Sequence, residues 1–257
     1  RPSPGRVRAR SRVVAESDGR GCTRLAVLLS ESPLLLRRTG IGSGTGLTVH
    51  VVGGGAGPLR GDDLRLDIEV GPGAELEIRS VAAQLALPGR AHLPQSRLEI
   101  HATVAPGASL RWLPEPLIAA AGCDHLTVTR VEVADGGSLF WRDDLVCGRH
   151  GEDSGDVRTD TTIRYAGSTL YRHELSVGPN APGWSGAAVL GGGRAIGTVI
   201  AAPASLLPPA TSGPADYAVM PLAGPGALAT AVAADIRPIR AALDPLSLPT
   251  PAALRTG

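Results

Sequence analysis

The chain has 257 residues, a formal net charge of +1, 43% hydrophobic residues and only 3% aromatic residues. Its sequence contains no lysine, which excludes a Schiff-base lysine, a Walker-type nucleotide loop and an amine general base. The near-zero net charge also argues against a bulk attraction to nucleic acid or to an anionic membrane.

Short alternating segments predict β-strands through most of the chain. Residues 5–16 and Thr23–Leu29 alternate as two strands joined by a turn, and Leu47–Val52 is typical of a buried β-branched strand. The 34 glycines and 22 prolines suit many short strands connected by tight turns. The composition therefore predicts an all-β protein.

One phrase recurs in the middle of the chain. Val104-Ala-Pro-Gly-Ala-Ser-Leu combines the end of a strand, a proline-glycine turn and the start of another strand. Similar phrases begin at Val70 and Val133, with a weaker copy at Tyr165. Repeats at this spacing indicate one supersecondary unit stacked on itself, so we expect stacked β-hairpins or a β-helical arrangement.

The composition changes after residue 178. Residues 179–215 are rich in glycine, proline, alanine and serine, and 226–243 form the best helix candidate because apolar residues recur every three or four positions. Pro238 falls inside this pattern and is expected to kink or divide the helix. We predict a single domain over 1–257, with a β-stack at 5–178, strands, a loop and one or two short helices at 179–245, and a tail at 246–257.

The cysteines indicate a reducing compartment. Cys22, Cys123 and Cys147 are odd in number and far apart, so they do not form a disulfide framework. We also find no signal peptide and no apolar run of about 18 residues that could span a bilayer. A cytoplasmic location is expected.

Several polar clusters could bind a metal ion. Asp62-Asp63 and Asp143-Asp144 are carboxylate pairs that we expect at strand ends, and a thiol, an imidazole and a carboxylate occur together at Cys147, His150 and Glu152. Such mixed ligands suit Ni, Zn or Cu better than Mg or Ca. If stacking brings these strand ends together, they would line a passage that binds a divalent cation weakly. The alternative is the ordinary polarity of surface loops.

Two other classes of function remain open at this point. Ser154 lies in an Asp-Ser-Gly phrase like that around a serine-protease nucleophile, so a β-rich serine hydrolase is one alternative. A purely structural β-solenoid that only binds partners is the other. The sequence has no recognisable Ser-His-Asp spacing, so binding or scaffolding is favoured over catalysis.

The order of several motifs resembles the urease accessory protein UreD (UreH) family. The matching segments are Gly61-Asp62-Asp63-Leu64, Val70–Ala74, Trp112-Leu113-Pro114-Glu115, Trp141–Arg149 and Gly197-Thr198-Val199. The sequence departs from the family pattern at Ala82–Ala86, where an Ala-Thr-Lys stretch and an aromatic residue are common. The resemblance extends from about Arg6 to Leu243.

This resemblance implies a β-helical, non-enzymatic maturation factor that acts with UreF and the GTPase UreG on apo-urease. It implies Ni²⁺ as transient cargo without a tightly bound cofactor, and allows a dimer of heterocomplexes. For the nickel passage we choose Asp62, Asp63 and Glu152, with Cys147 and His150 as transient ligands. Partner-binding candidates are Arg149, which would orient Glu152, and Leu228, Val232, Ile236 and Ile239, which would either face UreF or cover the β core.

Overall fold

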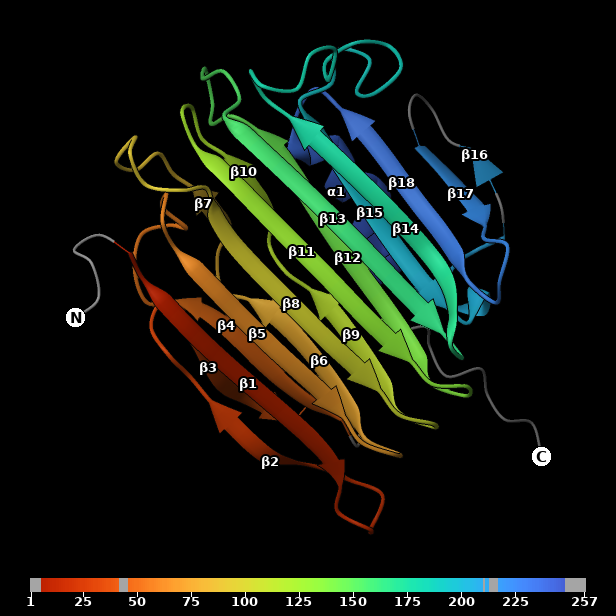
Figure 1. The fold of residues 1–257 in the computed structure, drawn as a ribbon. Helices are drawn as coiled ribbons and strands as arrows, with labels where there is room; N and C mark the ends of the chain where they lie inside the picture. The colour runs from red at the N-terminus through yellow and green to blue at the C-terminus, as the bar shows by residue number, and fades with distance from the viewer. Residues whose placement is uncertain (1–5, 42–45, 210, 213–216, 248–257) are drawn as a thin grey trace.

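The computed structural model describes residues 6–41, 46–209, 211–212 and 217–247. These residues form two β-sheets that pack face to face, with one α-helix against the outside of the larger sheet (Figure 1). Colour in Figure 1 changes steadily from one side of the stack to the other, because each successive repeat adds beside the previous one. The prediction of an all-β fold with a short C-terminal helix is confirmed.

The two sheets differ in size. The seven-stranded sheet contains, in spatial order, β14 (Ser168–Val177), β13 (Asp156–Tyr165), β11 (Asp124–Val133), β8 (Ser96–Val104), β5 (Asp63–Val70), β1 (Arg8–Ser17) and β2 (Thr23–Leu29). The eleven-stranded sheet contains β16 (Thr211–Ser212), β17 (Tyr217–Pro221), β18 (Ala227–Ala233), β15 (Ala195–Ala202), β12 (Ser138–Cys147), β9 (Ser109–Leu113), β6 (Glu75–Ser80), β4 (Leu47–Gly53) and β3 (Leu34–Ile41), with short β10 (Leu117–Ala119) pairing with β12 and β7 (Gln84–Ala86).

The repeats build the stack by crossing from one sheet to the other. In each of the first three repeats the strand before the turn lies in the seven-stranded sheet and the strand after it lies in the eleven-stranded sheet. Neighbouring repeats therefore pair in parallel, as β5 does with β8 and β6 with β9. Of the two expected arrangements, the structure has the β-helical one, and only the last repeat, β13 with β14, is an antiparallel hairpin.

The predicted turns stack on one another. Gly73, Gly107 and Gly136 occupy equivalent turn positions with φ values of +68°, +68° and +74°, a region that glycine adopts without steric cost. The N–H of Gly107 donates to the carbonyl of Gly136 at 3.1 Å, which ties one turn to the next. The core between the sheets continues the same register, since Leu66 of β5 aligns with Ile100 of β8 and both are buried.

The predicted helix at 226–243 is wrong in its first half. Residues 227–233 form strand β18, and helix α1 spans Ile236–Ser247. Leu228 and Val232 are four residues apart, a spacing that also fits the period of two in a strand. Pro238 does not divide α1, because it lies in the first helical turn, where its missing N–H has no intrahelical partner to lose.

Helix α1 covers the outer face of the eleven-stranded sheet over β15 and β18. Its residues Ile239 and Leu243 are fully buried there. Gly197 of β15 permits this close approach, since a Cβ atom at that position would lie 2.5 Å from Ile239 Cγ2 and 2.6 Å from Leu243 Cδ1. The helix is thus part of the folded core.

Candidate cation passage between the sheets

The first predicted carboxylate pair is divided between two environments. Asp62 is buried in the turn before β5, where its carboxylate accepts hydrogen bonds from the backbone N–H of Leu59 at 2.8 Å and of Val7 at 3.4 Å. Asp63 begins β5, is exposed, and lies 3.8 Å from the guanidinium of Arg8. Asp62 therefore already has backbone partners that hold the turn together.

The second predicted group begins at the last residue of β12 and continues into the loop after it. Arg149 donates to Glu152 at 2.8 Å, and this hydrogen bond lowers the pKa of the Glu152 carboxyl to about 2. Cys147 is buried, and burial raises the pKa of its thiol to about 11. His150 is exposed. The thiol is thus held in its protonated form, whereas the carboxylate is ionised and paired.

The structure does not bring these five predicted residues into one metal site. Among the described residues, no group of three or more His, Cys, Asp and Glu side chains is arranged to hold a metal ion. None of the five borders the cavity between the sheets. Their part in nickel passage stays a prediction. The cavity between the sheets is lined by other residues.

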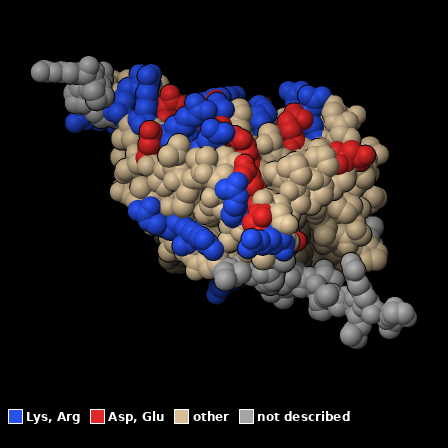
Figure 2. Space-filling model, turned by 90° about the horizontal axis from the view of Figure 1, so that it is seen from below, with Lys and Arg blue, Asp and Glu red and all other residues tan. Residues whose placement is uncertain are grey.

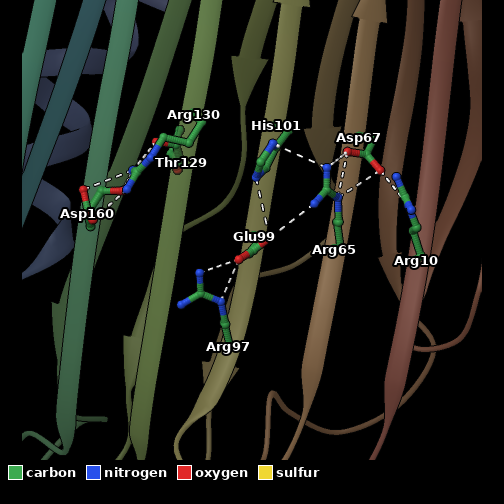
Figure 3. A network of polar contacts seen from close by, with 9 residues as sticks. All are labelled: Arg10, Arg65, Asp67, Arg97, Glu99, His101, Thr129, Arg130 and Asp160. Atoms are coloured by element: carbon green, nitrogen blue, oxygen red, sulfur yellow. Dashed lines mark hydrogen bonds and ion pairs between the residues drawn. The ribbon is translucent and has the colours of Figure 1, made fainter.

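The outer face of the seven-stranded sheet carries a network of ion pairs (Figure 3). Arg10 donates to Asp67 at 2.8 Å, and Arg130 lies 2.8 Å from Asp160. Glu99 is contacted by Arg65, Arg97 and His101, and its hydrogen bond from Arg97 contributes most to the lowered pKa of its carboxyl. Figure 2, a view from below, shows basic and acidic side chains next to each other along one edge of the molecule, while most of the rest of this face is uncharged. The carboxylates of this network are already neutralised by arginine.

A cavity of about 460 Å³ lies between the two sheets. Its wall changes from apolar to polar across the seven-stranded sheet, because one row of aligned inward positions reads Leu66, Ile100, Thr129, Thr161 and His173. His173 is exposed on the edge strand β14, so it borders the cavity where it meets solvent. The cavity thus has hydroxyl groups along its wall and an imidazole at its edge.

Asp143 projects into this cavity from the middle of β12. It aligns with Thr198 of β15, which also borders the cavity. Its Oδ2 accepts a hydrogen bond from Trp141 Nε1 at 2.7 Å and its Oδ1 from Trp112 Nε1 at 3.3 Å. Burial raises the pKa of Asp143 to about 7, the two indole hydrogen bonds oppose this rise, and the charge of Asp144 adds to it. The carboxyl therefore changes its charge near neutral pH.

The expectation that Asp143 and Asp144 lie at a strand end is wrong. They lie inside β12, and the alternation of the strand sends Asp144 to the opposite face, under α1. There its carboxylate accepts from Arg142 at 2.8 Å, and Arg142 also donates to Asp244 of α1 at 2.6 Å. Among the described residues that border the cavity, Asp143, Asp144 and Glu115 carry carboxylates. That of Asp144 points away toward Arg142, that of Glu115 is paired with Arg240, and that of Asp143 has neutral partners.

Asp143 is not among the residues predicted for the nickel passage. The signal was present, since Leu139, Trp141, Asp143 and Leu145 alternate in phase, which places the carboxylate on the same face as buried apolar residues. The threonines of β11 and β13 carry the same signal, because they occupy core-facing positions. The sequence does not show that Asp143 of β12 and the threonines of β11 and β13 border the same cavity.

The predicted partner-binding residues differ in exposure. Arg149 is exposed, but Ile239 of α1 is fully buried against the eleven-stranded sheet. Leu228 and Val232 point inward from β18, since they align with Ile200 and Ile196, which border the cavity. Ile236 is partly buried against the cluster beneath α1. Covering of the β core accounts for the apolar face of α1, and partner binding by these residues stays a prediction.

The hydrolase alternative lacks a catalytic arrangement. Ser154 is buried, and its hydroxyl donates to the carbonyl of Gly155 at 2.9 Å. In the described part of the chain no histidine hydrogen-bonds to Ser154, so no imidazole is placed as a general base for this hydroxyl. The structured segments also contain no helix long and apolar enough to cross a membrane.

Comparison with known proteins identifies the family. The sequence model of the family described as UreD urease accessory protein matches residues 7–255. A urease accessory protein UreD of Parafrankia sp. (strain EAN1pec) is 43% identical over 96% of this chain and 90% of its own length. Proteins of that name from Streptomyces griseus subsp. griseus and Streptomyces coelicolor are each 45% identical, over 93% of this chain and 95% of their own lengths. The chain therefore belongs to the UreD urease accessory protein family.

Proposed function

We propose that the chain is a non-catalytic factor of urease maturation that gives Ni²⁺ a route through the cavity between its sheets. Its partners would be UreF, the GTPase UreG and apo-urease, in the cytoplasm, as the family resemblance implies. The observation that carries the proposal is the carboxyl of Asp143, which borders the cavity and has no arginine partner among the described residues.

The donor set of the cavity suits a borderline cation in transit. A carboxylate, an imidazole and hydroxyl groups are ligands that Ni²⁺ accepts, and thiolates that would retain a softer ion are absent from the described lining. A single carboxylate with hydroxyl groups supplies few strong ligands, so the ion would keep part of its water shell. Such a site binds weakly and releases readily, as a carrier must.

Nickel loading of urease tests the proposal. The cognate urease is co-expressed with UreF, UreG and either the wild-type chain, Asp143→Asn or no UreD chain, and the nickel content of the purified urease is measured. Asp143→Asn should lower nickel content at least severalfold while the variant still co-purifies with its partners. Asp135→Asn is the matched control, because Asp135 lies in an exposed turn between β11 and β12. Unchanged loading with Asp143→Asn would exclude this route.

The same assay tests the residues chosen from sequence. Glu152→Gln removes the charge that Arg149 neutralises, and Asp62→Asn keeps the size of a side chain that caps a turn. If Glu152 and Asp62 carry Ni²⁺, both variants should lower nickel content without loss of complex assembly. Loss of assembly would instead assign them a structural role. Variants of Asp63, Cys147 and His150 complete the series.

A further inference from the structure

We propose that Trp112 and Trp141 are positioning residues that aim the carboxylate of Asp143 into the cavity. This inference rests on the proposed function, because it explains how the carboxylate would be presented to Ni²⁺. The indoles would not contact the ion. They would act through the two hydrogen bonds that they donate to Asp143.

The backbone register brings the three side chains together. Trp112 of β9 aligns with Trp141 of β12, and their rings stack with centroids 5.0 Å apart and an interplanar angle of 16°. Asp143 follows Trp141 by two positions, so it shares the inward face of β12. Each indole N–H reaches a different carboxylate oxygen, at 2.7 Å from Trp141 and 3.3 Å from Trp112.

The stacked rings leave the carboxylate little rotational freedom. Trp141 is fully buried and Trp112 is 6% exposed, so neither indole can turn away. Two donors on separate oxygens fix the plane of the carboxyl group and occupy one lone-pair direction on each oxygen. The remaining directions are available to a cation in the cavity. Outer partners that orient a ligand in this way commonly change metal affinity by about 10- to 100-fold when they are removed.

Buried indoles also need acceptors for their N–H groups, so the hydrogen bonds could serve packing alone. The two explanations differ in what a tryptophan-to-phenylalanine change should affect. A purely structural role predicts lower stability without a specific effect on cation binding. A positioning role predicts an effect on binding that exists only while Asp143 is present, and that is larger for the shorter hydrogen bond.

Calorimetric titration of the 257-residue chain with Ni²⁺ at constant pH separates these explanations. Trp141→Phe should weaken Ni²⁺ binding by about tenfold or more, and Trp112→Phe should weaken it by less. Trp184→Phe is the control, because Trp184 lies in the loop after β14 and does not border the cavity. In an Asp143→Asn background, Trp141→Phe should cause no further change. Thermal unfolding of each variant reports the structural cost separately.

The outcomes distinguish the inference from the function beneath it. Equal Ni²⁺ affinity in wild type and both tryptophan variants, or equal weakening by Trp141→Phe with and without Asp143, would overturn the positioning role alone. Ni²⁺ binding that Asp143→Asn leaves unchanged would overturn the cation route and the positioning role together. If Trp141→Phe does not fold, Trp112→Phe and the double variant Trp112→Phe/Asp143→Asn decide the question. Trp112→Phe should disturb the fold less, because Trp112 makes the longer of the two hydrogen bonds.

Discussion

Asp143→Asn should change how the stability of the protein depends on pH. The substitution keeps the size of the side chain that borders the cavity but removes its ability to ionise. In the folded wild type the pKa of Asp143 is about 7, against a usual value of 3.8. Burial is the main cause, so the folded state favours the protonated carboxyl group.

The raised pKa determines the pH window. Below about pH 4 both states are protonated, and the contribution of Asp143 to stability is complete. As the pH rises from 4 to 7 the unfolded chain releases its proton while the folded chain retains it, so the free energy of unfolding falls. The pKa values of Asp143 in the folded and unfolded states differ by roughly three units. At 1.36 kcal/mol per unit, this difference lowers the free energy of unfolding by about 4 kcal/mol. This is an upper limit, because Asp143 keeps part of its surface accessible.

Asp143→Asn abolishes this pH-dependent fall in stability, but it lowers the free energy of unfolding by an amount that does not depend on pH. The amide of asparagine offers one acceptor oxygen, so one of the two indole N–H groups loses its partner, at a cost of about 1–2 kcal/mol. The variant should therefore be slightly less stable than wild type at pH 4.5 and more stable by roughly 2 kcal/mol at pH 8.

Urea unfolding followed by circular dichroism at pH 4.5, 6, 7 and 8 measures this difference directly. Asp135→Asn is again the control and should follow the wild-type curve, since Asp135 is exposed. A stability difference between Asp143→Asn and wild type that does not vary with pH would contradict this prediction, because it would show that Asp143 ionises normally in the folded state.

Three further substitutions test other parts of the fold. His125 is fully buried and its pKa is lowered to about 4 by burial, so stability should fall by roughly 3 kcal/mol as the pH drops from 6.5 to 4, and urea unfolding of His125→Gln should lack this decline. Gly197→Ala forces a Cβ against Ile239 and should cost about 1–3 kcal/mol, read from urea unfolding, with limited proteolysis reporting release of α1. Arg142→Met leaves the buried carboxylate of Asp144 unpaired and should lower the free energy of unfolding by about 3–5 kcal/mol. A change below 1 kcal/mol in the free energy of unfolding, for Gly197→Ala or for Arg142→Met, would show that α1 adapts to the substitution.

The stack could be predicted because its signal is local. A proline-glycine turn between alternating segments specifies two strands and a reversal within about ten residues, and its recurrence after Val70, Val104 and Val133 implies stacking. Whether the two strands of one repeat pair with each other or with the strands of the next repeat is not a local property. It depends on burying the inward faces of both strands against each other, which separates the strands into different sheets.

The C-terminal region shows the limit of periodicity. Leu228 and Val232 fit both a helix and a strand, because a spacing of four is a multiple of two. The alanines between them are buried under α1 as alternate residues of β18. Pairing with β15 on one side and β17 on the other favours the strand, and those contacts join segments far apart in the sequence.

Which residues share a face of each strand can be read from the sequence alone, because a period of two is a property of the extended backbone. Asp143 and Trp141 share a face of β12 on this ground alone, whereas the inward placement of Thr129 follows from the pairing of β11 with β8 and β13. Only the tertiary structure decided that these faces meet across one cavity and that Asp144 turns instead toward Arg142 and α1. The physical reason is that a strand pattern defines two opposite faces, whereas the packing of the sheets decides what each face meets.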